Sequence, residues 1–181
     1  MTANVIFESV QPRSAAGAGT EVNAELRWIP AAGGAQQPIT VVADAGAFPA
    51  GGYPHFTGDT SRVFYHDGTS LVSVAWDGSD RTVVLARATP QTVISPDGRH
   101  VLSRAGPRRH IYLFERPQVA DSIAIDPTSG QPPVPVRRLT RAGGEFPAFS
   151  RDGSRAIWTH GNTLHVYDVA RGDQATADSI A

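Results

Sequence analysis

The segment SPDGRHVLS at residues 95–103 is a tight turn followed by a strand, and the chain contains two variants of it. One is SRDGSRAIW at residues 150–158, and a weaker one is TGDTSRVFY at residues 57–65. Pro presets φ at the second position of a turn, and Asp-Gly supplies the reversal that the next strand requires. The β-branched and aromatic residues that follow alternate with period two, as half-buried strands do. The chain is therefore predicted to repeat one β-module.

The spacing of these copies identifies the module. Val63 and Val101 lie 38 positions apart, close to the roughly 40-residue period of a four-stranded propeller blade. Val101 and Ala156 lie 55 apart, and the surplus falls in residues 117–135, which contain five prolines and are predicted to form a long loop. A hairpin turn and a partner strand follow each copy, with the partner strands at residues 71–76, 110–114 and 163–168.

These patterns predict an all-β chain, a partial β-propeller of about three to four blades of antiparallel strands whose ring is not closed. No helix longer than about two turns is expected, because no segment sustains the 3.6-residue apolar period. The expected divisions are an incomplete first blade at 1–44, a second blade at 45–88, a third at 89–141 with the loop 117–135, and an incomplete fourth with a C-terminal tail at 142–181. Strands of the first blade are expected near 5–10, 25–30 and 38–42.

Composition excludes several classes of function. The net charge is −1 and all sixteen basic residues are Arg, which argues against a nucleic-acid binder and against any mechanism that needs a lysine. There are no Cys residues, so disulfides, thiolate nucleophiles and cysteine–zinc sites are absent. The sequence contains no stretch of 18 apolar residues, so no transmembrane helix is predicted. No signal peptide is visible at the N-terminus.

The Ser-Pro-Asp-Gly turns resemble the TolB-type β-propeller repeat. Residues 135–168 more specifically resemble the propeller that precedes the catalytic barrel in a subset of bacterial amidohydrolases, and the likeness extends through residues 51–86. Three positions depart from the pattern: Arg151 replaces the turn proline, Phe149 stands where Trp is frequent, and Thr60 replaces a turn glycine. The resemblance implies a neighbouring catalytic domain or protein partner and a periplasmic or secreted location.

The metal-binding residues of an amidohydrolase are not found in this chain. Such a site uses a His-x-His pair, and no two of the six histidines are separated by one residue: His55, His66, His100, His110, His160 and His165. Ser95 and Ser150 lie outside any Gly-x-Ser-x-Gly elbow. We therefore expect no catalytic residue, metal or cofactor in this chain.

Two groups of residues have a possible binding function as well as a structural role. His160, His165 and Asp168 offer zinc ligands, but the neighbours of His165 are typical of a packed strand, so packing is favoured. The arginines of the third blade offer a clamp for a carboxylate or phosphate, but charge on a solvated blade edge is favoured. These are Arg104, Arg108, Arg109, Arg116, Arg137, Arg138 and Arg141.

Strand direction predicts one candidate binding face. Consecutive antiparallel strands reverse direction, so alternate connections share a side. The Ser-x-Asp-Gly turns and the loop 117–135 share one side, and the hairpin turns and inter-blade links share the other. By analogy with other propellers the second side is the candidate binding face, with His66, Asp67, Arg108, Arg109, His160 and Asn162.

Three functions follow as hypotheses. The first is a non-catalytic propeller segment that scaffolds or binds, within a longer metal-dependent amidohydrolase-like protein. The second is a free-standing TolB-like protein-binding propeller of the bacterial envelope. The third is an enzyme with its site on the propeller face. Self-association through open blade edges is also expected.

Overall fold

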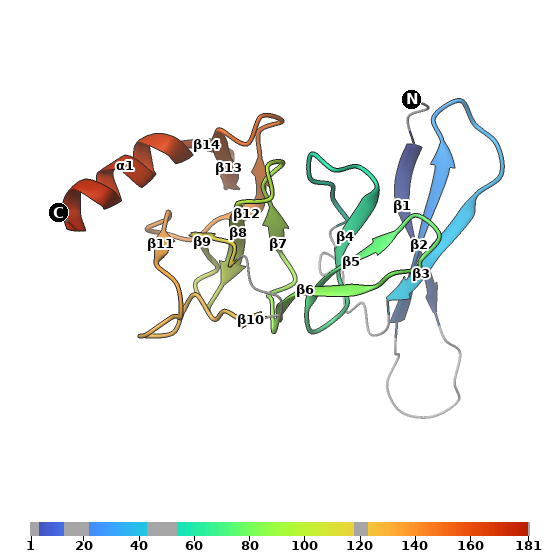
Figure 1. The fold of residues 1–181 in the computed structure, drawn as a ribbon, viewed down its shortest axis with the longest axis horizontal. Helices are drawn as coiled ribbons and strands as arrows, with labels where there is room; N and C mark the ends of the chain where they lie inside the picture. Colours follow the sequence, from blue (N-terminus) through green and yellow to red (C-terminus); the bar gives the residue numbers. More distant parts are fainter. Residues whose placement is uncertain (1–3, 13–21, 43–53, 118–122, 181) are drawn as a thin grey trace. The chain divides into compact units, whose positions relative to one another are not determined.

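A computed structural model describes residues 4–12, 22–42, 54–117 and 123–180 of the chain. Within these residues the strands form sheets that are built mainly from antiparallel strands consecutive in the sequence (Figure 1). The chain divides into two compact units: unit 1 comprises Met1–Phe56 and Thr60–Pro90, and unit 2 comprises Thr57–Asp59 and Gln91–Ala181. The predicted all-β class, a partial β-propeller of three to four blades, is confirmed by these sheets.

The first sheet of unit 1 holds three antiparallel strands in sequence order, β1 (Asn4–Pro12), β2 (Val22–Pro30) and β3 (Gln37–Val42). The pairing of β1 with β2 runs without interruption from Asn4 opposite Pro30 to Pro12 opposite Val22. A bulge between Leu26 and Arg27 interrupts the pairing of β2 with β3. The expected loop at residues 13–21 and the link at Ala45-Gly46 lie outside the described residues.

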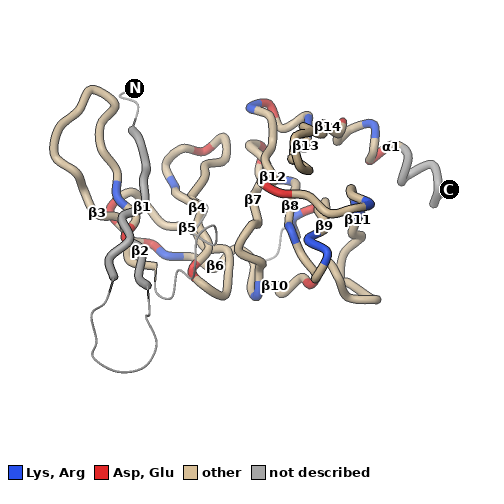
Figure 2. Tube along the Cα trace, turned by 180° about the vertical axis from the view of Figure 1, so that it is seen from behind, with Lys and Arg blue, Asp and Glu red and all other residues tan. Residues whose placement is uncertain are grey.

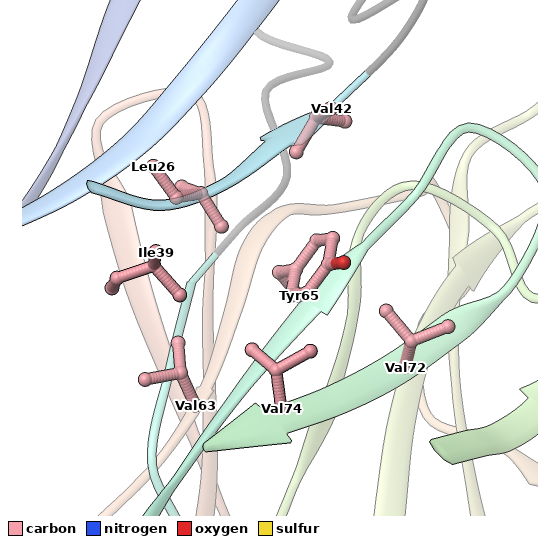
Figure 3. Close-up of a cluster of buried hydrophobic side chains, with 7 residues drawn as sticks. All are labelled: Leu26, Ile39, Val42, Val63, Tyr65, Val72 and Val74. Carbon is pink, nitrogen blue, oxygen red and sulfur yellow. The ribbon is translucent and has the colours of Figure 1, made fainter. Parts of the chain in front are cut away.

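The second sheet of unit 1 contains β4 (Arg62–His66), β5 (Leu71–Ala75) and β6 (Thr82–Ala86), again antiparallel. Apolar residues of this sheet pack onto apolar residues of the first sheet, and together they form the core of unit 1. Figure 3 shows the side chains from both sheets directed toward one another: Leu26, Ile39, Val42, Val63, Tyr65, Val72 and Val74. Trp28 meets Trp76 edge-on at a centroid distance of 5.7 Å, at the margin of this core.

The third sheet belongs to unit 2 and has the order β11-β9-β8-β7. Its strands are β7 (Thr92–Ile94), β8 (His100–Ala105), β9 (His110–Glu115) and β11 (Val136–Arg138). The Pro-rich segment joins the neighbours β9 and β11, and it contains the two-residue strand β10 (Ile123–Ala124). Residues 118–122 of that segment lie outside the described part.

The fourth sheet has the order β12-β13-β14, with β12 (Glu145–Phe149), β13 (Arg155–His160) and β14 (Thr163–Asp168). Strand β12 lies against β7 and β8, so the third and fourth sheets pack face to face. Their shared core consists of Val93, Leu102, Ile111, Leu113, Ala156, Trp158 and Val169. Trp158 also stacks on His165, with centroids 5.5 Å apart and planes 6° apart.

The Ser-x-Asp-Gly turns have the structure that their sequence predicts. Ser95 Oγ accepts from the backbone N–H of His100 at 2.9 Å, and Ser150 Oγ accepts from that of Arg155 at 3.0 Å. Gly98 and Gly153 both have φ of 73°, the left-handed region that favours glycine. In the weaker copy Thr60 stands in place of the turn glycine, and the Thr57 hydroxyl donates instead to the carbonyl of Asp59 at 3.4 Å.

The prediction that no helix exceeds about two turns is wrong at the C-terminus, where α1 (Val169–Ile180) has twelve residues. Asp168 Oδ1 accepts a hydrogen bond from the backbone N–H of Arg171 at 2.9 Å, which is N-cap geometry. Buried Val169 anchors the first turn in the core of unit 2. Local capping and one apolar anchor therefore start this helix without an extended apolar stripe.

Candidate functional site

His66 ends β4 and supports the hairpin turn that follows it. The residue is buried, with 3% of its surface exposed. The backbone N–H of Gly68 donates to Nδ1 at 3.1 Å, and Nε2 lies 2.7 Å from the carbonyl oxygen of Ala88. Since Nδ1 accepts, Nε2 carries the proton and donates, which assigns the neutral tautomer. Both ring nitrogens are therefore occupied by the backbone of unit 1.

Asp67 closes the same turn. Its Oδ1 accepts from the backbone N–H groups of Thr69 at 3.0 Å and Ser70 at 2.8 Å, and its Oδ2 pairs with Arg81. Burial acts to raise the pKa of this carboxyl group, but the hydrogen bonds and the Arg81 charge outweigh burial and leave the pKa lowered. Asp67 is thus held as a carboxylate that shapes the loop.

Arg108 and Arg109 occupy the turn between β8 and β9, and both are exposed. The backbone N–H of Arg109 donates to the carbonyl of Gly106 at 3.0 Å, and Arg109 adopts a positive φ of 53°. Its carbonyl accepts from the N–H of Gly144 at 2.9 Å, which ties the turn to the link before β12. Arg109 Nη1 also lies 3.4 Å from Glu145 Oε1. The turn is therefore fixed by its backbone while its guanidinium groups face solvent.

His160 and Asn162 lie at the two-residue turn between β13 and β14, where His160 pairs with Thr163. Gly161 supplies a positive φ of 56° at the first central position, as a type II′ turn requires. His160 and Asn162 are exposed. The β13–β14 turn corresponds in the repeat to the β8–β9 turn, and the two sheets that hold these turns contact each other through β12. We call Arg108, Arg109, His160 and Asn162 the hairpin end of unit 2.

The hairpin end carries more positive than negative charge. Figure 2 shows blue segments in the region of β8 and β9 and a red segment at β12. Glu145 is the acidic residue of β12, and its Oε1 also lies 3.9 Å from Arg104 Nη1. One carboxylate therefore faces two guanidinium groups, those of Arg104 and Arg109.

His66 and Asp67 belong to unit 1, whereas the other four members of the candidate face belong to unit 2. Four of the six predicted residues therefore belong to one unit, at two of its hairpin turns. Sequence reasoning did not distinguish the buried His66 from the exposed His160, because both precede a hairpin turn.

The residues of the zinc alternative have other partners. His165 stacks flat on Trp158, and Asp168 caps α1. Three positions apart on one strand, His165 and Asp168 point to opposite faces of the sheet. Among the described residues, no group of three or more His, Asp or Glu is arranged to hold a metal ion.

The serines and aspartates of the repeats are engaged within their turns. Ser150 and Ser154 donate their hydroxyl groups to Asp152 Oδ1 at 2.6 and 2.8 Å, and the backbone N–H of Ser154 donates at 3.0 Å. These bonds lower the pKa of Asp152 to about 2. At Asp97, burial acts to raise the pKa, while bonds from Ser95 and Arg99 outweigh it and lower the pKa.

A polar cluster beside α1 was missed by sequence reasoning. Arg137 Nη1 donates to the Tyr167 hydroxyl at 2.7 Å and lies 3.6 Å from Asp173 Oδ1. His100 Nε2 lies 3.3 Å from Asp173 Oδ2. The cluster depends on α1, which the sequence pattern did not predict, so no sequence signal pointed to it.

Comparisons with known proteins give no family assignment. No family model and no curated protein matches the chain. Among solved structures, the chain is similar to TolB from Acinetobacter baumannii at a TM-score of 0.42 and 15% identity, over 81% of this chain and 47% of that one. In the part of the chain that the structure describes, no helix has the length and apolar character needed to cross a membrane.

Proposed function

We propose that this chain is a non-catalytic β-propeller segment that acts as a scaffold or protein-binding module. One observation carries the proposal: the hairpin end of unit 2 presents exposed polar residues on turns whose backbones are fixed by hydrogen bonds. Gly144 and Gly106 hold the Arg109 turn, and Gly161 shapes the turn beside Asn162. Exposed side chains on a rigid scaffold are the usual form of a binding surface.

The chemistry of this surface favours an acidic partner. Arg108 and Arg109 project from one turn, and Glu145 is the carboxylate that faces Arg109. Arginine pairs with carboxylates in bidentate fashion, which gives orientation as well as affinity. We therefore propose that the hairpin end of unit 2 binds an acidic protein surface.

Two parent proteins are compatible with this proposal. The resemblance of residues 135–168 supports a longer metal-dependent amidohydrolase-like protein in which this segment contacts the catalytic domain. The alternative is a free-standing TolB-like protein-binding propeller of the bacterial envelope, supported by the Ser-Pro-Asp-Gly turns. The reading frame around the chain discriminates them: a downstream barrel with a His-x-His pair supports the first, and an upstream signal peptide with a downstream stop supports the second.

Binding is tested with polyglutamate as the acidic probe and the R108E/R109E variant. Its matched control is R99E/R151E, which makes the same charge change at two exposed arginines of the Ser-x-Asp-Gly turns. We expect R108E/R109E to abolish binding at low salt and the control to retain it. Equal loss in both variants would show that only the net charge matters and would reject the hairpin end as the binding surface.

A further inference from the structure

Four polar side chains of unit 2 meet beside the N-terminal half of α1. Arg137 comes from β11, Tyr167 from β14 and His100 from β8, while Asp173 is on α1 itself. Arg137 Nη1 lies 3.6 Å from Asp173 Oδ1, and His100 Nε2 lies 3.3 Å from Asp173 Oδ2. Two basic groups from different strands therefore converge on one carboxylate, one at each oxygen.

The groups that surround this carboxylate are held in place by the sheets. Arg137 Nη1 donates to the Tyr167 hydroxyl at 2.7 Å, and the guanidinium carbon lies 5.9 Å from the centre of the Tyr167 ring. His100 is fixed through its backbone, because its N–H donates to Ser95 Oγ and its carbonyl accepts from the N–H of Ser95, both at 2.9 Å. Its side chain is only 10% exposed. The guanidinium and the imidazole are thus positioned in advance of any ligand.

Asp173 fits between these groups imperfectly. Charge-assisted hydrogen bonds to a carboxylate are about 2.7–2.9 Å long, and both contacts of Asp173 are longer. Among the described residues, His100 Nε2 is buried without a hydrogen-bond partner. A buried polar atom without such a partner costs free energy, so a carboxylate that came closer would be stabilised here. The side chain of Asp173 is 45% exposed, which leaves its carboxylate open to exchange.

The attachment of α1 is mainly polar, which makes Asp173 replaceable. Val169 joins the core of unit 2 at the first turn of the helix. Further along, α1 meets the sheets through Gly172 and Asp173. A Cβ at Gly172 would collide with the Tyr167 hydroxyl and with Arg137, so the helix backbone lies directly on the cluster. A helix of twelve residues is marginally stable on its own in water, so little holds α1 in place once the polar contacts are exchanged.

We propose that Arg137 and His100 form a binding site for a carboxylate group, and that Asp173 is an internal occupant that an external carboxylate displaces together with α1. Tyr167 positions the guanidinium. The bound carboxylate accepts from Arg137 Nη1 on one oxygen and from His100 Nε2 on the other, and an imidazole donates from Nε2 in its cation and in one neutral tautomer. The source of the carboxylate is a small organic acid or an acidic side chain of a protein.

This carboxylate site is separate from the hairpin end of unit 2. His100 begins β8, whereas the turn that carries Arg108 and Arg109 follows the last residue of the same strand, Ala105. The two sites therefore lie at opposite ends of β8, and each can fail its test without affecting the other.

The first test follows the His100 ring by NMR while sodium acetate replaces sodium chloride at constant ionic strength in the full chain. D173A deletes the internal carboxylate, and G172A pushes α1 off the site without changing the net charge. Because an occupant that leaves the site empty less than about a tenth of the time weakens apparent affinity about tenfold, we expect both variants to bind acetate more than about tenfold more tightly than the wild type. D126A removes another exposed carboxylate of unit 2 and is expected to bind like the wild type.

The second test locates the site with two arginines of β11. In the D173A background, R137Q is expected to abolish the response of His100 to acetate. R138Q makes the same charge change at the exposed neighbouring residue and is expected to retain the response. The proposal is overturned if D173A and G172A bind acetate no more tightly than the wild type, or if R137Q and R138Q respond alike.

A third measurement distinguishes the two sources of the carboxylate. The probe is a blocked Gly-Asp-Gln tripeptide, which has the sequence of residues 172–174. Tighter binding of the tripeptide than of acetate to D173A supports an acidic side chain of a protein as the ligand, and equal or weaker binding supports a small organic acid. Binding of neither probe to D173A rejects the site.

Discussion

Leu102 and Ile157 hold the same position of the repeat but have different surroundings, which makes Leu102→Ala and Ile157→Ala an informative pair. Leu102 is 0% exposed between the third and fourth sheets, whereas Ile157 is half-buried on the face of the fourth sheet that carries the exposed Val166. Each substitution removes three carbon atoms. If burial by the neighbouring sheet determines how much each side chain contributes to stability, the two substitutions lower the free energy of unfolding by different amounts.

The magnitude follows from the burial. Three buried carbon groups at about 0.8 kcal/mol each give a transfer cost of about 2.4 kcal/mol for Leu102→Ala. The cavity that remains between two packed sheets raises the total to about 3–5 kcal/mol. For Ile157→Ala, solvent already reaches the side chain and no closed cavity forms, so about 1 kcal/mol is expected.

The assay is urea unfolding followed by far-UV circular dichroism, with the free energy of unfolding extrapolated to zero denaturant. It is performed near 1 µM protein, where association adds little to stability. Losses that agree within about 0.5 kcal/mol, near the error of extrapolation, would refute the assignment of Leu102 to a covered face and Ile157 to an open one.

Further outcomes are expected from backbone, charge and metal chemistry. Gly78→Ala is expected to lower the free energy of unfolding by more than about 2 kcal/mol, because φ is 79° and a Cβ would lie 2.0 Å from the carbonyl oxygen of Ile39. Gly33→Ala is the control: φ is 84° but the space around it is open, so about 1–2 kcal/mol is expected. Equal losses of unfolding free energy in the two variants would contradict the reasoning. Asp152 has a pKa of about 2 against an ordinary 3.8, so its contribution is present above pH 3.8 and is lost as pH falls toward 2; acid titration of D152N is expected to show a weaker pH dependence in that window, and an unchanged profile would argue against it. Asp168→Ala is expected to cost about 1 kcal/mol and reduce the helical signal at 222 nm, whereas an unaltered spectrum would mean that the cap is dispensable. The dialysed protein is expected to contain no stoichiometric zinc and to show no metal-dependent hydrolysis, and one bound metal per chain by elemental analysis would contradict this.

Much of the fold could be predicted because its signals are local. The turns at Ser95 and Ser150 depend on hydrogen bonds that span at most five residues, so the residue types report the geometry directly. The hairpin at Gly161 is predicted by the same logic. The helix α1 was missed because it begins with one capping aspartate and one buried valine, a signal too short to register as periodicity.

The candidate site could be predicted only in part. Arg108 and Asn162 lie at hairpin turns, as strand alternation predicts, and a shared binding side for the two turns stays a prediction. Strand alternation could not show that His66 is buried with both ring nitrogens bonded, because Ala88 lies 22 residues away and reaches His66 only through the folded sheet.

The repeat register, the strands and their turns follow from the order of residues, because each depends on neighbours within one blade. The burial of each apolar face does not. Leu102 and Ile157 are similar side chains at the same repeat position, and no local pattern separates them. Packing against a sheet more than forty residues further along the chain buries Leu102, while Ile157 has no such sheet among the described residues and stays in contact with solvent. Hydrophobic burial depends on the surface that arrives from elsewhere in the structure, which only the tertiary fold supplies.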